Sequence, residues 1–305
     1  MASARAPFLK DLGWRAEAVA FVVFSAVLRM MPVDVASAIG GWIGRMVGPL
    51  SPAHGTAMRN LELAMPELDL SERRRIALEQ WESFGRYIFE FPLSHRLTIA
   101  SGRVQVVGGE RFEAVAQSGR PAVFISGHLA NVDIMAAAIL EAGIICDITY
   151  RAANNPYVDR RMVETRRRYG VRLFAPKGVE GGRAMIEGLG AGRSVAMLND
   201  QRYDGGSRGV FFGHEVMTNP AAARLAQRFG TTIQPLSIRR TRGARFKLTC
   251  HEPIALAAAP DRQAAIDQTV QAINAFVEAR VRERPGEWWW MHKRFPPEVY
   301  RAEGG

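Results

Sequence analysis

His128 and Asp133 have the residue types and the spacing of a proton-transfer pair. In the segment PAVFISGHLANVD, an apolar run that we predict to be a strand ends at Ser126, and His128 follows after one glycine. Asp133, which four residues separate from His128, falls at the start of a predicted helix, where the helix dipole alone would also favour an acid. A carboxylate that accepts a hydrogen bond from one ring nitrogen leaves the other nitrogen free to take a hydroxyl proton. We therefore predict that Asp133 orients His128 as a general base.

Polar residues also follow two other predicted strands. Arg151 directly follows one apolar run, and Asn199, Asp200 and Gln201 follow another. Ligands of open α/β sheets bind at the carboxyl edge of the strands, so we expect these side chains to lie near His128. A histidine base suits acyl transfer in which a hydroxyl attacks a thioester directly. Consistent with that chemistry, the sequence contains no GxSxG nucleophile motif.

The elements that must position these residues alternate between two types. Beyond residue 100, short apolar runs at 103–107, 122–126, 144–150, 171–174, 194–198 and 232–239 alternate with helical patterns. This alternation predicts an α/β fold with a mainly parallel central sheet flanked by helices, in a domain spanning residues 51–305. Before it, residues 71–95 are predicted to form an amphipathic helix with Ser71 as its N-cap.

Residues 1–50 are expected to form an N-terminal membrane-associating segment. Glu17 and Arg29 bracket an uncharged stretch of 11 residues, whereas a spanning helix needs about 20 apolar residues. A second apolar stretch, 33–50, follows Pro32 and carries Asp34 and Arg45. One imperfect span and two interfacial helices both fit this pattern, and a buried helical hairpin stays open. A cleavable signal peptide fits less well, because no small-residue cleavage site precedes the proline.

Composition restricts the partners and the chemistry. Lys and Arg outnumber Asp and Glu by 40 to 30, and the net charge of +10 favours anionic partners such as nucleic acid, acidic lipid headgroups or an acidic carrier protein. Five arginines between residues 157 and 169 suit phosphates or an acidic protein in particular. Cys146 and Cys250 each lie in an apolar run and are expected to be buried thiols. No phosphate-binding glycine motif and no metal-ligand spacing is present, so we expect no metal and no cofactor beyond an acyl thioester co-substrate.

Several segments together resemble a known family. GHLANVD, YRAANNP, LNDQRYDGG, the FFG and TNPAAARLA runs, and PGEWWWMHKRFP occur in this order. They are similar to the bacterial lipid A biosynthesis acyltransferases of the lauroyl/myristoyl type, and the resemblance extends from the N-terminal hydrophobic segment to Phe295. It implies a monotopic or single-pass enzyme at the cytoplasmic face of the bacterial inner membrane. The implied reaction moves an acyl chain from acyl carrier protein to a hydroxyl of a lipid A precursor.

The resemblance also implies roles for individual residues. His128 matches the family's base and Asp133 its acidic partner, in an H-x4-D motif. Arg151 matches an arginine that steadies the oxyanion or a substrate phosphate, and Asp200 matches an acid that some relatives use near the histidine. With Asn131 and Gln201, these two residues form the expected substrate-binding set. Many members carry an aromatic residue where this chain has Val132, which leaves acyl-chain length and acceptor identity open.

Other functions compete with this expectation. Within enzymes, the acceptor could be a lysophospholipid or another glycolipid, with acyl-CoA as the donor. The basic charge permits a nucleic-acid-binding protein, although the sequence lacks the interleaved aromatic and basic strands of RNA-binding modules, so no nucleic acid partner is expected. A metal-dependent hydrolase using His128 and Asp133 is weaker still, because the sequence offers no second ligand pair.

Overall fold

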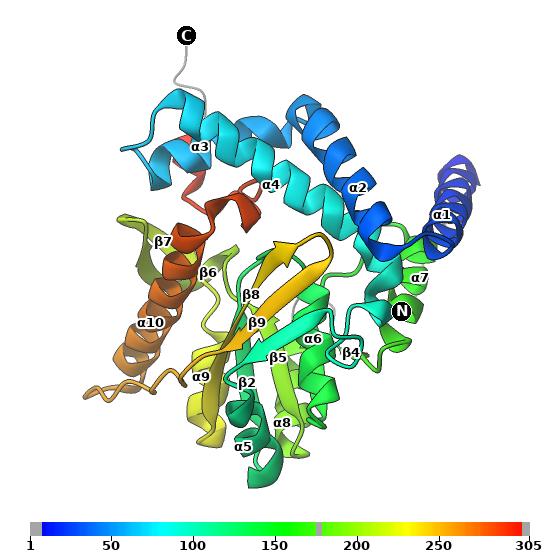
Figure 1. Ribbon diagram of the computed structural model, residues 1–305. Helices are drawn as coiled ribbons and strands as arrows, with labels where there is room; N and C mark the ends of the chain where they lie inside the picture. Colours follow the sequence, from blue (N-terminus) through cyan, green and yellow to red (C-terminus); the bar gives the residue numbers. More distant parts are fainter. Residues whose placement is uncertain (1–7, 175–178, 301–305) are drawn as a thin grey trace.

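The computed structural model describes residues 8–174 and 179–300, which fold around a central seven-stranded sheet (Figure 1). The strand order is β1-β9-β8-β2-β5-β3-β4, and every neighbouring pair is parallel except β8 with β9. These strands are β1 (Val104–Val107), β2 (Ala122–Ser126), β3 (Cys146–Thr149), β4 (Arg172–Phe174), β5 (Ser194–Leu198), β8 (Thr232–Arg242) and β9 (Arg245–Cys250). The predicted α/β fold with a mainly parallel sheet is confirmed.

Helices cover both faces of this sheet, and the central strand β2 is buried throughout. Because successive side chains of a strand point to opposite faces, Phe124 packs in one core cluster with Phe112 and Ile134, whereas Ile125 packs in another with Leu225. The first face carries α5 (Gly109–Ser118) and α6 (Val132–Glu141), and the second carries α8 (Val179–Gly190), α9 (Ala221–Phe229) and α10 (Arg262–Glu283). The two covered faces explain why the strand sequences are apolar without alternation.

A separate antiparallel hairpin follows β5 directly. It consists of β6 (Arg202–Phe211) and β7 (His214–Thr218), and it lies against α10. The backbone nitrogen of Val210 donates to Gln271 of α10 over 2.6 Å, and the backbone nitrogen of Phe212 donates to Glu278 over 2.6 Å. The hairpin therefore fixes the direction in which the chain leaves the carboxyl end of β5.

Residues 8–90 contribute four helices, of which α2 and α4 cross in close contact. They are α1 (Phe8–Arg29), α2 (Val33–Val47), α3 (Ala53–Ala64) and α4 (Leu70–Glu90), and the short 3-10 turn Phe91–Arg96 follows α4. A Cβ atom at Gly44 or Gly85 would collide with the backbone of the opposite helix, so glycine permits the contact. The N-cap of α4 is Asp69, in a capping box with Glu72, and the expectation of Ser71 at this position is wrong.

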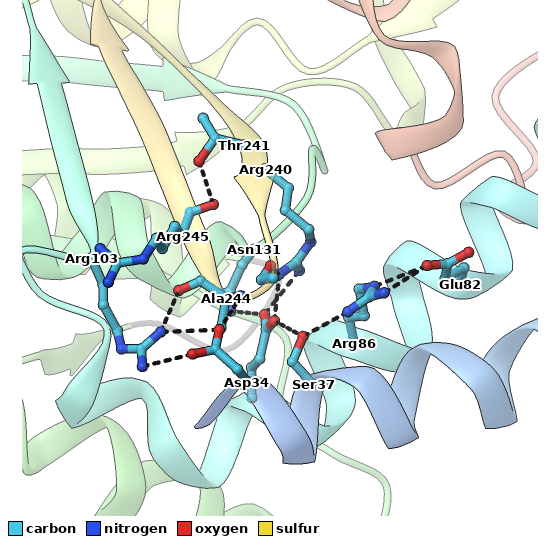
Figure 2. Close-up of polar contacts among 12 residues, drawn as sticks. Asp34, Ser37, Glu82, Arg86, Arg103, Asn131, Arg240, Thr241, Ala244 and Arg245 are labelled. Carbon is cyan, nitrogen blue, oxygen red and sulfur yellow. Dashed lines mark hydrogen bonds and ion pairs between the residues drawn. The ribbon is translucent and has the colours of Figure 1, made fainter. Parts of the chain in front are cut away.

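Polar contacts attach α2 to the sheet and to α4. Asp34 accepts hydrogen bonds from Arg103 over 2.9 Å and from the backbone nitrogen of Ala244 over 2.8 Å (Figure 2). Ser37 donates to the buried Glu90 carboxylate of α4 over 2.6 Å. Residues 33–47 are thus part of the folded body, which also agrees with their packing on α4.

Helix α1 lies at the outer edge of the molecule and contacts α7 (Pro156–Arg167) (Figure 1). Asn155 donates to the backbone oxygen of Trp14 over 2.9 Å, and the Tyr157 hydroxyl donates to Asp11 over 2.8 Å. Among the helices in residues 8–174 and 179–300, none combines the length and the hydropathy needed to cross a bilayer.

Candidate active site

His128 lies at the carboxyl edge of the sheet, as predicted, and its ring pairs with Asp200. Strands β2 and β5 are parallel neighbours in which Ser126 is opposite Leu198, so the residues two positions further on meet. His128 Nδ1 is 2.6 Å from Asp200 Oδ1, and the backbone nitrogen of His128 donates to Asp200 Oδ2 over 2.5 Å. The imidazole and the carboxylate are therefore fixed to each other through both side chain and backbone.

Asp200 is a buried carboxylate whose partners favour its ionised form. It is 2% exposed, and its Oδ2 also accepts a hydrogen bond from Trp288 Nε1 over 2.7 Å. Burial by itself would raise the pKa of this group, but electrostatic attraction to the imidazole and the hydrogen bonds from His128 and Trp288 hold the pKa well below its usual range. An ionised carboxylate only accepts hydrogen bonds, so the neutral His128 ring carries its proton on Nδ1 and a lone pair on Nε2.

Asp133 does not make the predicted contact with His128. Its Oδ1 accepts hydrogen bonds from Arg166 Nε over 2.7 Å and from the Tyr169 hydroxyl over 2.7 Å, and its Oδ2 accepts one from the Tyr87 hydroxyl over 2.9 Å. The reason is that the second position of α6 is buried, and a buried carboxylate needs a cation and donors, which α4, α7 and the turn after α7 supply. Burial would raise the pKa of Asp133, but Arg166 and the two hydroxyls lower it. The ring-orienting contact is thus corrected from Asp133 to Asp200.

The side chain of Asn131 takes part in a buried polar cluster. Its amide nitrogen donates to Glu90 Oε2 over 2.9 Å, and Arg240 Nη2 donates to the same oxygen over 3.0 Å (Figure 2). Asn131 and Glu90 are both fully buried. This cluster connects the loop after His128 with α4 and β8. The expected substrate-binding role of Asn131 stays a prediction.

Arg151 lies on the same sheet edge but not beside the imidazole. It comes two residues after β3, and β5 separates β3 from β2. Two strand spacings amount to about 10 Å. Arg151 is exposed, and within the part of the chain that the structure describes its guanidinium forms no hydrogen bond or ion pair. Its geometry suits contact with an anionic group arriving from solvent.

Three residues of the C-terminal segment complete the surroundings of His128. Trp288 binds Asp200, while the rings of Trp289 and His292 lie 5.0 and 5.2 Å from the His128 ring, centroid to centroid. Gln201 Nε2 lies 3.4 Å from His128 Nε2 and 3.3 Å from His292 Nε2. In the sequence this aromatic and basic segment stands out only as one of the motifs shared with the family. Nothing in its local pattern connects it to the carboxyl edge of β2.

Comparison with known proteins identifies the family. The model of the bacterial lipid A biosynthesis acyltransferases matches residues 8–296. The chain belongs to this family. It is 26% identical over 250 residues to the lipid A biosynthesis lauroyltransferase of Escherichia coli K12, covering 78% of this chain and 77% of that protein. It is 22% identical over 272 residues to the lipid A biosynthesis palmitoleoyltransferase of the same organism, covering 87% and 86%.

A third relative extends the comparison to another genus. A lipid A biosynthesis acyltransferase of Haemophilus influenzae is 20% identical over 278 residues, which cover 88% of this chain and 84% of that protein. The resemblance drawn from the sequence motifs is confirmed, and the protein is an acyltransferase of lipid A biosynthesis. The His128 and Asp200 pair therefore belongs to a protein whose family performs acyl transfer.

Proposed function

We propose that this acyltransferase moves a fatty acyl chain from acyl carrier protein to a hydroxyl of a lipid A precursor, with His128 as the general base and Asp200 as the group that orients it. The single observation that carries this proposal is the 2.6 Å bond between His128 Nδ1 and the buried Asp200 carboxylate. It directs the basic lone pair of Nε2 away from Asp200. The names of the relatives, a lauroyltransferase and a palmitoleoyltransferase, support a fatty acyl group.

The proposed reaction needs no covalent enzyme intermediate. His128 Nε2 takes the proton of the acceptor hydroxyl while the hydroxyl oxygen forms a bond to the thioester carbonyl carbon. The carbon–sulfur bond of the tetrahedral intermediate then breaks, and the imidazolium returns the proton to the departing thiolate. An ester and a free carrier thiol result. Asp200 stabilises the transient imidazolium without taking its proton.

We assign Asp133 a positioning role instead of the predicted direct one. Its ion pair with Arg166 and its bonds to Tyr87 and Tyr169 connect α6, α4 and the region of α7. Since α6 begins four residues after His128, these contacts hold the loop that carries the base.

The exposed arginines suit the anionic substrates of this reaction. Of the five arginines between residues 157 and 169, Arg166 is committed to Asp133, whereas Arg160, Arg161, Arg167 and Arg168 are exposed. Arg151 lies nearby in the chain and is exposed as well. We propose that this basic group receives the phosphates of the lipid or the acidic surface of the carrier protein.

The apolar surface of α1 and α2 supports attachment to the cytoplasmic face of the bacterial inner membrane. These helices lie at one end of the molecule, away from α5, α8 and α9 (Figure 1). Their large exposed apolar side chains are Phe8, Leu9, Leu12, Val19, Val22, Val23, Val27, Val35, Ile39, Trp42, Met46 and Val47. Soluble monomers rarely expose an apolar area of this kind. We propose that both helices lie in the interface.

A donor and acceptor panel tests the proposal. Purified wild-type enzyme and His128→Ala are incubated with lauroyl carrier protein or lauroyl-CoA, and with a lipid A precursor, a lysophospholipid or another glycolipid. Mass spectrometry of the lipid products is expected to show one added acyl chain on the lipid A precursor with the carrier donor, and none with His128→Ala. Full activity in that variant contradicts the mechanism. Preferential acylation of the lysophospholipid from CoA supports the alternative function instead.

A further inference from the structure

The amide nitrogen of Gln201 lies between the two imidazoles of the site. Its distances to Nε2 of His128 and of His292 are 3.4 and 3.3 Å. The indole of Trp289 packs against both rings, with centroid distances of 5.0 and 5.8 Å. Both imidazole rings thus direct their Nε2 atom toward the Gln201 carboxamide.

The protonation of His128 determines how this contact is made. Asp200 accepts a hydrogen bond from Nδ1–H of the ring, so Nε2 of the neutral imidazole is an acceptor. An amide nitrogen can only donate, and Gln201 therefore places an N–H group against the atom that is proposed to receive the hydroxyl proton. Its second N–H group is available to Nε2 of His292.

We infer that the Gln201 carboxamide stabilises the oxyanion of the tetrahedral intermediate and that His292 holds it in position; this inference rests on the proposed function. An acceptor hydroxyl bound to His128 Nε2 lies about 3 Å from the carbonyl carbon it attacks. A donor beside Nε2 then faces the carbonyl oxygen. As the oxygen–carbon bond forms, the π electrons of the carbonyl move to that oxygen, and the Gln201 N–H group donates to it until the carbon–sulfur bond breaks.

Arg151, a second possible donor to the oxyanion, is less well placed than Gln201. Arg151 is exposed and follows β3, which is two strands from the strand that carries His128. Gln201 is half-buried and directly follows Asp200, the residue that binds the His128 ring. Side-chain amides serve as oxyanion donors in other acyl-transfer enzymes. Gln201 is thus assigned as a catalytic residue and His292 as a positioning residue.

A double-mutant cycle tests both assignments. Gln201→Met keeps the size of the side chain and removes the donor, so kcat is expected to fall about 10²-fold or more with little change in KM. His292→Ala is expected to lower kcat less, and His292→Asn, which retains an acceptor, to recover part of that loss. In the Gln201→Met background, His292→Ala is expected to cause almost no further loss, because it acts through Gln201.

Controls separate the possible failures. Gln263→Met, on the exposed first turn of α10, is the matched control and is expected to retain wild-type kcat. If the wild-type enzyme is active and the kcat of Gln201→Met is within threefold of the wild-type value, the inference is overturned while the proposed function stands. Multiplicative losses in the double variant overturn the positioning role of His292. A wild-type enzyme that acylates no acceptor of the panel overturns the proposed function and, with it, this inference.

Discussion

Two buried aspartates near His128 differ in what they bind, and this difference predicts different consequences of their loss. Asp200 contacts the His128 ring, whereas Asp133 contacts Arg166 and two tyrosines. Asp200→Asn is expected to lower kcat about 10³-fold, since an asparagine can favour the wrong ring tautomer. The measurement is the acyl-transfer rate at saturating substrate, with circular dichroism as the control for folding.

Asp133→Asn is expected to affect stability more than the chemical step. The substitution leaves Arg166, whose side chain is only 13% exposed, without a counter-charge, and removing one member of a buried ion pair costs about 3 kcal/mol. Urea unfolding measures this loss. If instead Asp133→Asn abolished kcat at unchanged stability while Asp200→Asn stayed active, the assignment of the two carboxylates would be reversed.

His251 is expected to make the protein sensitive to mild acid. Burial, with the charges of Arg280 and Arg111, lowers its pKa to about 4, compared with about 6.5 in the unfolded chain. Between these values the unfolded state binds more protons, so the free energy of unfolding decreases as the pH falls from about 6.5 to about 4. His251→Gln removes this titration. Unfolding curves at several pH values are expected to have a smaller pH slope in the variant, and equal slopes would contradict the prediction.

At the scale of elements, the crossing of α2 and α4 depends on the absence of side chains at its centre. A Cβ atom at Gly85 would overlap the backbone of Gly40 and Gly44. Gly85→Ala is therefore expected to lower the free energy of unfolding by about 1–3 kcal/mol, despite the better helix propensity of alanine. Gly55→Ala in α3 is the matched control, because a Cβ atom there has nothing within 4 Å. Equal stability of the two variants in thermal unfolding would contradict this packing argument.

A buried polar cluster connects α2 with the loop that carries His128. Ser37 of α2 and Asn131 beside the catalytic loop both donate to Glu90, and Arg240 of β8 pairs with the same carboxylate. Asp34 adds a second attachment to the β8–β9 turn (Figure 2). The proposed membrane-facing helix and the loop that carries His128 thus share one buried carboxylate as a common support.

At the scale of the whole molecule, the apolar surface of α1 and α2 predicts how the protein binds a bilayer. Trp42 on α2 is 67% exposed. Trp42→Asp is expected to weaken binding to anionic vesicles about tenfold or more, because an apolar ring no longer enters the interface. Vesicle sedimentation measures the bound fraction.

The matched control for this prediction lies on another part of the surface. Ile145, just before β3, is 65% exposed and lies at the amino end of that strand. Ile145→Asp is expected to leave vesicle binding unchanged. Equal binding by wild-type enzyme and Trp42→Asp would contradict the proposed orientation of the helices.

The sequence by itself determined the strands of the central sheet and the position of the proposed base. Apolar runs separated by helical patterns predict an α/β fold, because the hydrophobic periodicity that distinguishes a strand from a helix is set by nearby residues. His128 was found for the same reason, since the end of its strand is visible within a few residues. The family was also evident, because its motifs are local and ordered along the chain.

The sequence placed Asp200 and Gln201 at the same sheet edge as His128, but only the tertiary structure decided which acid binds the ring. Asp133 is five positions away in sequence but binds Arg166, whereas Asp200, 72 residues away, meets the ring because β5 is inserted beside β2. Trp288, Trp289 and His292 reach the site through the bridge between Leu129 and Trp288. Strand order and such long-range contacts follow from the packing of the whole core, and short-range sequence patterns do not predict them.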